Sequence, residues 1–316
     1  MLGLLVTFSF SLMFLIASSS FLLKFIEKFS GRIKISPLVV GATVVAIGTS
    51  LPETFVAFSS IAQKAVDISF GDVVGANIAN ICLTIGLGIL LFPVRFGTQK
   101  TQRNNYIMIL VTAYFIALMF IPPPLRKGLA VLSIAFYAVF LIVETVWGEI
   151  GRKKEDRKAL AKLATKNGSV VGYFAGMAVS LVGLLASSHF LVKSVIQFSV
   201  LFNISEEIIG LSVVAVGTAL PELATSIASA FDKDWKLLYG NIQGSNIYNL
   251  AVVGSILLIA NNLSYRMPVF PLAVLGVSTV TIVYLSHRYE GTHIPRLWGL
   301  LFIGFYAFYI WKIYQF

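Results

Sequence analysis

Ten apolar stretches follow one another along the chain, and most of them are long enough to cross a lipid bilayer. A spanning helix needs about 20 apolar residues. The composition agrees, because 57% of the residues are hydrophobic and only 12% are charged, too few to cover a soluble domain. We therefore expect an all-α polytopic membrane protein, which excludes a soluble enzyme and a disulfide scaffold. The expected spans are residues 2–23, 37–62, 71–92, 105–121, 128–147, 170–192, 207–230, 240–260, 267–286 and 296–313.

The basic residues predict the orientation of these spans. The net charge is +10, but Lys and Arg form short clusters between the apolar stretches, as topology signals do, and we expect no nucleic-acid partner. If the N-terminus lies outside, 18 of the 24 basic residues fall in inside connections. We therefore expect a multi-pass protein of the cell (inner) membrane with both termini outside. The most basic connection, residues 148–169, then lies in the cytoplasm.

An internal repeat divides the chain into two halves. Residues 41–53 read GATVVAIGTSLPE and residues 210–222 read GLSVVAVGTALPE, with nine of thirteen positions identical at an offset of 169. The same offset aligns GDVVGANIAN at 71–80 with GNIQGSNIYN at 240–249. One offset that holds for two separate motifs indicates a duplication.

The halves are residues 1–147 and 170–316, joined by the basic loop 148–169, and each contains five expected spans. Because five is odd, the second half enters the membrane in the opposite orientation. The predicted architecture is therefore ten transmembrane helices in two inverted five-helix repeats, which is common among secondary transporters. A duplicated scaffold without a site is the alternative.

Each repeat places one carboxylate in the middle of an apolar span. Glu53 and Glu222 occupy equivalent positions, and a charge in mid-membrane costs at least about 2.5 kcal/mol. A single such Glu could serve only as a hydrogen-bonding residue, but two at equivalent positions favour a site. Pseudo-twofold symmetry would bring them together, where both stay ionised only with a cation or proton nearby. Charged oxygen ligands suit Ca²⁺.

The residues before each Glu are expected to interrupt the helix. Pro52 and Pro221 each remove an amide donor and clash with the preceding turn. Carbonyls freed of their partners are tolerated inside a membrane where they line a cavity or coordinate ions. An ordinary proline kink is the alternative. The carbonyls expected to lose partners are those near Ala46, Thr49, Ala215 and Thr218.

The second motif of each repeat adds amides and glycines. Asn77 and Asn80 share a helix face, as do Asn246 and Asn249, and they could serve either as packing contacts or as ion ligands. Glycines four residues apart let helices pack closely, so we interpret Gly71, Gly75, Gly240 and Gly244 as packing positions.

The remaining polar residues have ordinary interpretations. We interpret Asp72 as a helix-end residue with at most a weak gating role, and Glu206 and Glu207 as acids at an outside helix start. Cys82 is expected to pack in the interior. No nucleotide-binding loop or nucleophile–base arrangement is present in the sequence, so we expect neither ATP-driven transport nor an enzyme, and no cofactor.

The two motif pairs resemble those of the sodium/calcium exchanger family, prokaryotic type, within the calcium/cation antiporter superfamily, and the resemblance covers essentially the whole chain. It implies a Ca²⁺ site made by Glu53, Glu222 and the Thr49 and Thr218 carbonyls, flanked by Na⁺ sites. The positions that match the Na⁺ sites or the ion pathway are Ala46, Ser50 and Ser245 for an inner site, Ala215 and Thr218 for an outer one, and Asn80 and Asn249 between them.

Three positions depart from the family pattern. Ala76 and Ala219 stand where the archaeal-type pattern has serine, and Asn249 stands where close prokaryotic relatives often have Asp. The expected outer Na⁺ site therefore lacks two hydroxyl oxygens. The resemblance implies an antiporter that exchanges Ca²⁺ for Na⁺ by alternating access, with no obligate protein partner. A Ca²⁺/H⁺ antiporter is the alternative, and a passive cation channel or ion-sensing membrane protein is a further one.

Overall fold

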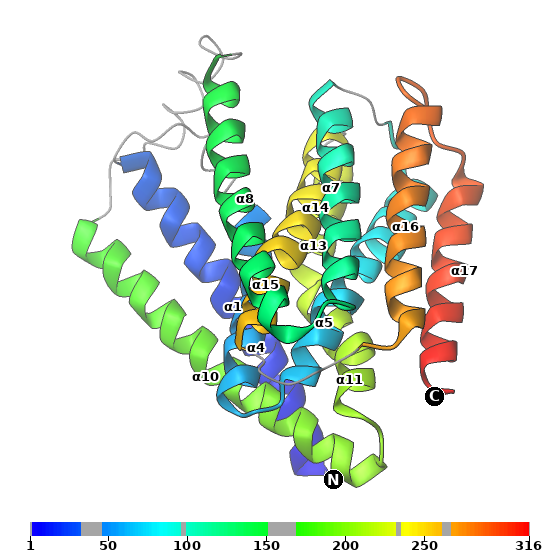
Figure 1. Cartoon of the computed structure of the whole chain (residues 1–316). Coiled ribbons are helices and arrows are strands. Elements are labelled where there is room, and N and C mark those ends of the chain that lie inside the picture. The colour runs from blue at the N-terminus through cyan, green and yellow to red at the C-terminus, as the bar shows by residue number, and fades with distance from the viewer. Residues whose placement is uncertain are drawn as a thin grey trace.

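The computed structural model of the chain is built almost entirely of helices (Figure 1). Within the described residues, the β-structure consists of one isolated antiparallel bridge between Arg95 and His293. The expected all-α class is confirmed. The structure describes residues 2–32, 46–95, 99–150, 169–231, 235–260 and 267–315.

Several of the expected spans are made of successive helical segments. The helices of the first half are α1 (Leu2–Arg32), α3 (Ala46–Thr49), α4 (Leu51–Ala62), α5 (Val66–Ala79), the π-helix η2 (Asn80–Ile85), α6 (Gly86–Leu91), α7 (Gln99–Leu118) and α8 (Pro123–Ile150). Those of the second half are α10 (Val170–Phe202), α11 (Glu206–Ile209), the π-helix η3 (Gly210–Val214), α12 (Ala215–Thr218), α13 (Leu220–Phe231), α14 (Trp235–Tyr248), the π-helix η4 (Asn249–Val253), α15 (Gly254–Ala260), α16 (Val269–Arg288) and α17 (Arg296–Ile313).

Seven stretches of the described residues are helical, long and apolar enough to cross a membrane. They match seven of the ten expected spans. The expected spans 105–121 and 296–313 are also helical, as α7 and α17, but do not belong to the seven. The expected span 37–62 begins outside the described residues, which resume at Ala46. The count of ten spans stays a prediction.

Several helices extend beyond the apolar stretches that predicted them. Helix α1 continues to Arg32 and α10 to Phe202, because a helix continues into polar sequence until a residue stops it. Asn203 stops α10 by adopting the left-handed conformation common at helix C-termini (φ 52°). Helix α5 begins at Val66, five residues before the expected start of this span at 71. Polar residues in the first two turns of α5 interrupt the apolar pattern, so the sequence did not indicate this start.

The first helices of the two halves, α1 and α10, lie side by side (blue and green in Figure 1). Both expose many large apolar side chains, as lipid-facing helices do. Their buried residues form a hydrophobic cluster with α4 and the start of α5. A second, larger cluster holds the remaining helices together. The molecule is therefore packed as a helix pair against a larger helical body.

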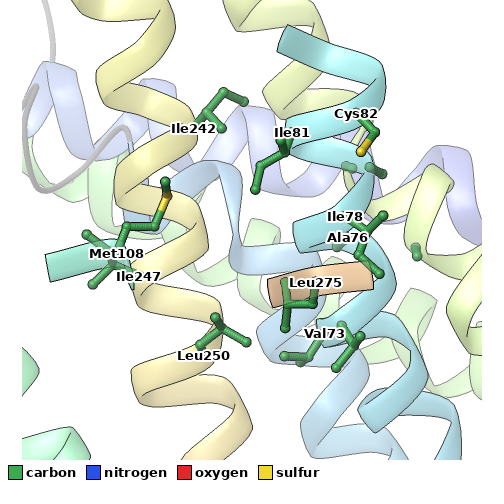
Figure 2. Close-up of a cluster of buried hydrophobic side chains, with 14 of the residues drawn as sticks. Val73, Ala76, Ile78, Ile81, Cys82, Met108, Ile242, Ile247, Leu250 and Leu275 are labelled. Carbon is green, nitrogen blue, oxygen red and sulfur yellow. The ribbon is translucent and has the colours of Figure 1, made fainter. Parts of the chain in front are cut away.

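The larger cluster surrounds the second motif of each half (Figure 2). Ile81 on η2 extends toward Ile242 on α14, whereas Ile78 and Cys82 extend from the opposite side of α5 and η2 into the same cluster. The expected packing role of Cys82 is confirmed, since its thiol is buried in this cluster. Well-packed apolar side chains thus hold the polar residues of these motifs in place.

Two glycines bring α5 very close to the helix that carries the second copy of the first motif. A Cβ atom at Gly71 would lie 2.5 Å from the Glu207 carbonyl oxygen, and one at Gly75 would lie 2.5 Å from that of Leu211. Any larger residue would displace the backbone there. The packing interpretation is confirmed for Gly71 and Gly75, but it is wrong for Gly240, where an added Cβ would meet no atom within 4 Å.

Connections expected on the same side of the membrane contact one another. Phe92 packs edge-on against Phe231 with ring centroids 5.0 Å apart, and Arg95 donates to the His293 ring. The backbone N–H of Ile294 also donates to the Val94 carbonyl at 3.1 Å. Contacts among residues 92–95, 231 and 293–294 agree with the expected alternation of the spans.

Candidate functional site

Both expected helix interruptions are present at equivalent positions. Helix α3 ends at Thr49 and α4 starts at Leu51, with Ser50 between them. Helix α12 ends at Thr218 and α13 starts at Leu220, with Ala219 between them. The sequence Thr-Ser/Ala-Leu-Pro-Glu therefore places each Glu in the first turn of a new helix, with its side chain completely buried.

The carbonyl that each proline deprives of a helical donor lies four residues before it, which is Gly48 for Pro52. This carbonyl accepts a hydrogen bond from the Ser19 hydroxyl of α1 at 2.9 Å. The expectation that the Ala215 carbonyl loses its partner is wrong, because it accepts from the Ala219 N–H at 3.1 Å. Proline affects only the carbonyl four residues before it, so the turn around Ala219 keeps this bond.

Glu53 and Glu222 are completely buried, and their carboxyl groups lie close enough to interact electrostatically. The Ser50 hydroxyl donates to Glu222 Oε1 at 3.1 Å. Glu222 Oε2 and both carboxylate oxygens of Glu53 have no hydrogen-bond partner among the described residues. Buried polar atoms almost always have partners, so three unpaired carboxylate oxygens require an explanation.

The difference between the two acids follows from one residue of the repeat. Position 219 is equivalent to Ser50, but Ala219 has no hydroxyl to donate to Glu53. The Thr218 hydroxyl lies on that side of the site, but its shortest hydrogen bond, 2.7 Å, goes to Asp72 Oδ1. Glu53 therefore lacks the serine hydrogen bond that Glu222 has.

The second motifs of the two halves contact each other through their asparagines. Asn80 Nδ2 donates to Asn246 Oδ1 at 3.0 Å, and Asn246 Nδ2 donates to the Asn77 carbonyl at 3.3 Å. Their remaining oxygens are free, since Asn77 Oδ1, Asn80 Oδ1 and both polar atoms of Asn249 are buried without partners in the described part of the chain. The asparagines thus join the helices and still present amide oxygens.

Each threonine of the first motif reaches the second motif of the other half. Thr49 Oγ1 lies 3.2 Å from Ser245 Oγ and donates to Asn241 Oδ1 at 3.4 Å. Thr218 reaches Asp72 in the same way, and Asp72 and Asn241 are equivalent positions of the repeat. All four motif segments therefore converge, and they gather the expected residues Thr49, Ser50, Glu53, Thr218, Glu222, Ser245, Asn80 and Asn249. Ala215 lies just before this break and Ala46 begins α3, although the side chain of Ala46 is outside the described residues.

Asp72 is the main residue that the interpretation of the sequence placed wrongly. It does not lie at a helix end, because α5 runs from Val66 through Ala79, and its side chain is fully buried. Its carboxyl group interacts electrostatically with Glu53 and Glu222. The repeat contained the signal, because the offset of 169 pairs Asp72 with Asn241, a second polar residue within an apolar helix.

Three π-helical segments adjoin the site. Segments η2 and η4 begin at the equivalent residues Asn80 and Asn249, and η3 (Gly210–Val214) directly precedes α12. Such segments are uncommon and frequently occur at functional sites, because they leave the regular hydrogen-bond pattern of the α-helix. Sequence periodicity did not predict them.

The arrangement offers carboxylate, amide, hydroxyl and carbonyl oxygens in the middle of apolar helices, and these are the ligands that hard cations prefer. Within the described ranges, no three His, Cys, Asp or Glu side chains are grouped as a ready-made metal site. A cation bound here would therefore depend on neutral oxygens as well as on the acids. A site made of neutral oxygens and acids together can bind a cation and also release it.

Comparison with known proteins gives consistent matches along the chain. The family model described as "Sodium/calcium exchanger protein" matches residues 3–146 and again residues 172–315. The chain is 33% identical to the inner membrane protein YrbG of Escherichia coli over 223 residues, or 69% of this chain and 68% of the relative. It is 28% identical to the sodium/calcium exchanger MaX1 of Methanosarcina acetivorans, with 94% of each chain covered.

A solved structure of the sodium-calcium exchanger NCX_Mj, soaked with Na⁺ and Sr²⁺, has the same fold. The TM-score is 0.67 at 26% sequence identity, and the match covers 97% of each chain.

Proposed function

Because the chain belongs to the sodium/calcium exchanger protein family, we propose that it is a secondary antiporter that exchanges Ca²⁺ for Na⁺ across the cell membrane. The observation that carries the proposal is the pair of fully buried acids, Glu53 and Glu222, at two equivalent helix breaks. Their unpaired carboxylate oxygens have no basic partner among the described residues, which supports a cation as the substrate.

The proposed Ca²⁺ ligands are the carboxylates of Glu53 and Glu222 and the backbone carbonyls of Thr49 and Thr218. Two carboxylates neutralise a divalent ion, and carbonyl oxygens complete its coordination without adding charge. Residues proposed for Na⁺ binding or for the ion pathway are Ala46, Ser50, Ser245, Ala215, Asn80 and Asn249. The free oxygens of Asn80 and Asn249 support this assignment.

Protons are the second candidate for the counter-ion, and one observation favours them. Ala76 and Ala219 both belong to the large apolar cluster, so no hydroxyl oxygen is present at either position. A small, hard cation such as Na⁺ needs several close oxygens. Exchange of Ca²⁺ for H⁺ would need fewer ligands, since a proton binds to a single carboxylate oxygen.

The proposed topology has ten spans, in two inverted halves at residues 1–147 and 170–316, joined by a cytoplasmic loop at 148–169, with both termini outside. The family model matches the chain twice, in stretches that agree with these halves. The contacts among the expected inside connections support the same alternation of spans.

Alternating access is proposed to come from movement of the α1–α10 pair against the larger helical body. The pair packs against the body through the smaller cluster, which includes Phe55 and Val56 of α4, whereas the core of the larger body is a separate cluster that the pair can move past without opening it. Ser19 on α1 holds the Gly48 carbonyl beside the helix break. The moving pair therefore touches the ion-binding segment directly.

Reconstituted protein tests the proposal. Liposomes loaded with Na⁺ should take up external Ca²⁺ when diluted into Na⁺-free buffer, and an imposed pH gradient should drive less uptake. Uptake driven by the pH gradient alone would establish the proton antiporter instead. Ca²⁺ entry that follows the membrane potential and needs neither gradient would identify a channel and overturn the proposal.

A further inference from the structure

Asp72 is a third carboxylate beside the two acids of the repeat. It lies in the middle of α5, its side chain is completely buried, and it interacts electrostatically with Glu53 and Glu222. The repeat does not require an acid here, because the equivalent position carries Asn241. The second half thus contributes a neutral amide where the first half contributes a charge.

The two oxygens of Asp72 differ. Oδ1 accepts the hydrogen bond from the Thr218 hydroxyl at 2.7 Å, which fixes the orientation of the carboxylate. Oδ2 is buried and has no partner among the described residues. The Thr218 oxygen donates in this contact, so its lone pairs remain open to a cation. An unpaired carboxylate oxygen therefore lies next to an available hydroxyl oxygen.

The charge balance points to a cation at this position. No basic side chain in the described part of the chain pairs with Asp72, Glu53 or Glu222. A buried charge is strongly disfavoured unless it is compensated. Three ionised carboxylates carry one more negative charge than a Ca²⁺ ion neutralises. The third acid therefore needs either a proton or a monovalent cation such as Na⁺.

Asp72 also lies near the two positions, 76 and 219, at which this chain lacks the hydroxyl oxygens of the family pattern. Asp72 is one helical turn before Ala76 on α5, and Thr218 immediately precedes Ala219. Ala76 and Ala219 both pack in the apolar cluster and offer no side-chain oxygen. A carboxylate at position 72 supplies a charged oxygen to the same region, on the Thr218 side of the site.

We propose that Asp72 is an additional ligand of the transport site and binds a sodium ion together with the Thr218 hydroxyl oxygen. This inference rests on the proposed Ca²⁺/Na⁺ exchange. It goes beyond the two-carboxylate site, because it assigns the monovalent ion to a residue that only one half of the repeat contains.

Asp72→Asn tests the inference, because asparagine has nearly the same shape and still offers an oxygen to the Thr218 hydroxyl. A purely structural role would survive this change, whereas a role that depends on charge would not. Purified variants in liposomes are assayed for Ca²⁺ efflux against external Na⁺ and, separately, for Na⁺-independent Ca²⁺/Ca²⁺ exchange. The matched control is Ser69→Ala, which removes a buried hydroxyl of α5 that bonds to Ser60.

We expect Asp72→Asn to raise the half-maximal Na⁺ concentration about tenfold or more, since losing one charged ligand costs on the order of 1.5 kcal/mol or more. Ca²⁺/Ca²⁺ exchange should stay within threefold of the wild type, and Ser69→Ala should leave the Na⁺ curve in place. Thr218→Val, which keeps the backbone carbonyl, should also raise the Na⁺ requirement. It serves as the test if Asp72→Asn does not fold.

The outcomes separate the two proposals. A wild type that exchanges Ca²⁺ without any response to Na⁺ would overturn the proposed exchange itself, and the inference with it. A Na⁺-driven wild type whose curve is unchanged by Asp72→Asn would overturn only the inference. A variant that changes the pH dependence of transport, with its Na⁺ curve unmoved, would also overturn it.

Discussion

Ala219→Ser should strengthen Na⁺ binding, because it gives Glu53 the hydrogen bond that Glu222 already has. Ser50 Oγ donates to Glu222 Oε1 at 3.1 Å, and position 219 is the repeat equivalent of Ser50. A serine hydroxyl at 219 should therefore reach the unpaired carboxylate of Glu53. It would orient this carboxylate and offer one more oxygen to a cation.

The structure also sets the size of the effect. Hydrogen bonds to charged groups contribute about 1.5–3 kcal/mol. The Ser50–Glu222 distance of 3.1 Å is longer than that of the strongest hydroxyl–carboxylate bonds, so the lower end of this range applies. About 1.5 kcal/mol corresponds to roughly a tenfold change in affinity. We therefore expect the half-maximal external Na⁺ concentration for Ca²⁺ efflux to fall about tenfold.

A small set of variants makes the test specific. Ala219→Cys has nearly the same size but a weak donor, so it should change the Na⁺ curve far less. Ser50→Ala should shift the curve in the opposite direction. Adding Ala76→Ser to Ala219→Ser should strengthen the Na⁺ dependence further. If Ser50→Ala weakens Na⁺ dependence but Ala219→Ser leaves it within twofold of the wild type, the inferred equivalence of the two positions is wrong.

Three further outcomes are expected. Glu53→Gln and Glu222→Gln should each abolish Ca²⁺ transport while the protein still elutes as a folded species, and near-wild-type transport by either would make that acid structural. Cysteines introduced at Lys158 and Gln315 should react with impermeant reagents from opposite sides of the membrane, and labelling from one side would rule out the ten-span topology. Gly75→Ala should lower stability by about 1–3 kcal/mol, since its Cβ would meet facing backbone at 2.5 Å, and an unchanged thermal transition would contradict this packing.

Much of the fold could be predicted from local sequence. Apolar stretches of bilayer length predicted the helices, because a chain inside a membrane must satisfy its own backbone hydrogen bonds. Pro52 and Pro221 predicted the helix breaks at Ser50 and Ala219, because proline acts on its own helix. Helix starts were less predictable. Asp67, Ser69 and Asp72 interrupt the apolar pattern of α5, although the helix includes all three.

The candidate site could be predicted in part. The repeat alone identified Glu53 and Glu222. Each copy places a charge inside a membrane span at a cost in free energy, so its presence in both copies indicated a function. Asp72 was missed because it belongs to only one half, and a single polar residue beside an apolar stretch resembles a helix end. Its role became apparent only through the contact between Asp72 and Thr218, which are 146 residues apart in the chain.

The sequence by itself determined that the chain is a helical membrane protein, that it is duplicated, and where its helices break. These features depend on hydropathy, repetition and proline, which act within a single segment. Only the tertiary structure decided which oxygens have partners. Ser50 donates to Glu222 Oε1 across 172 residues, whereas neither carboxylate oxygen of Glu53 has a hydrogen-bond partner among the described residues. Such pairing depends on how distant helices cross, and helix crossing is set by close backbone contacts such as those at Gly71 and Gly75, which no single segment encodes.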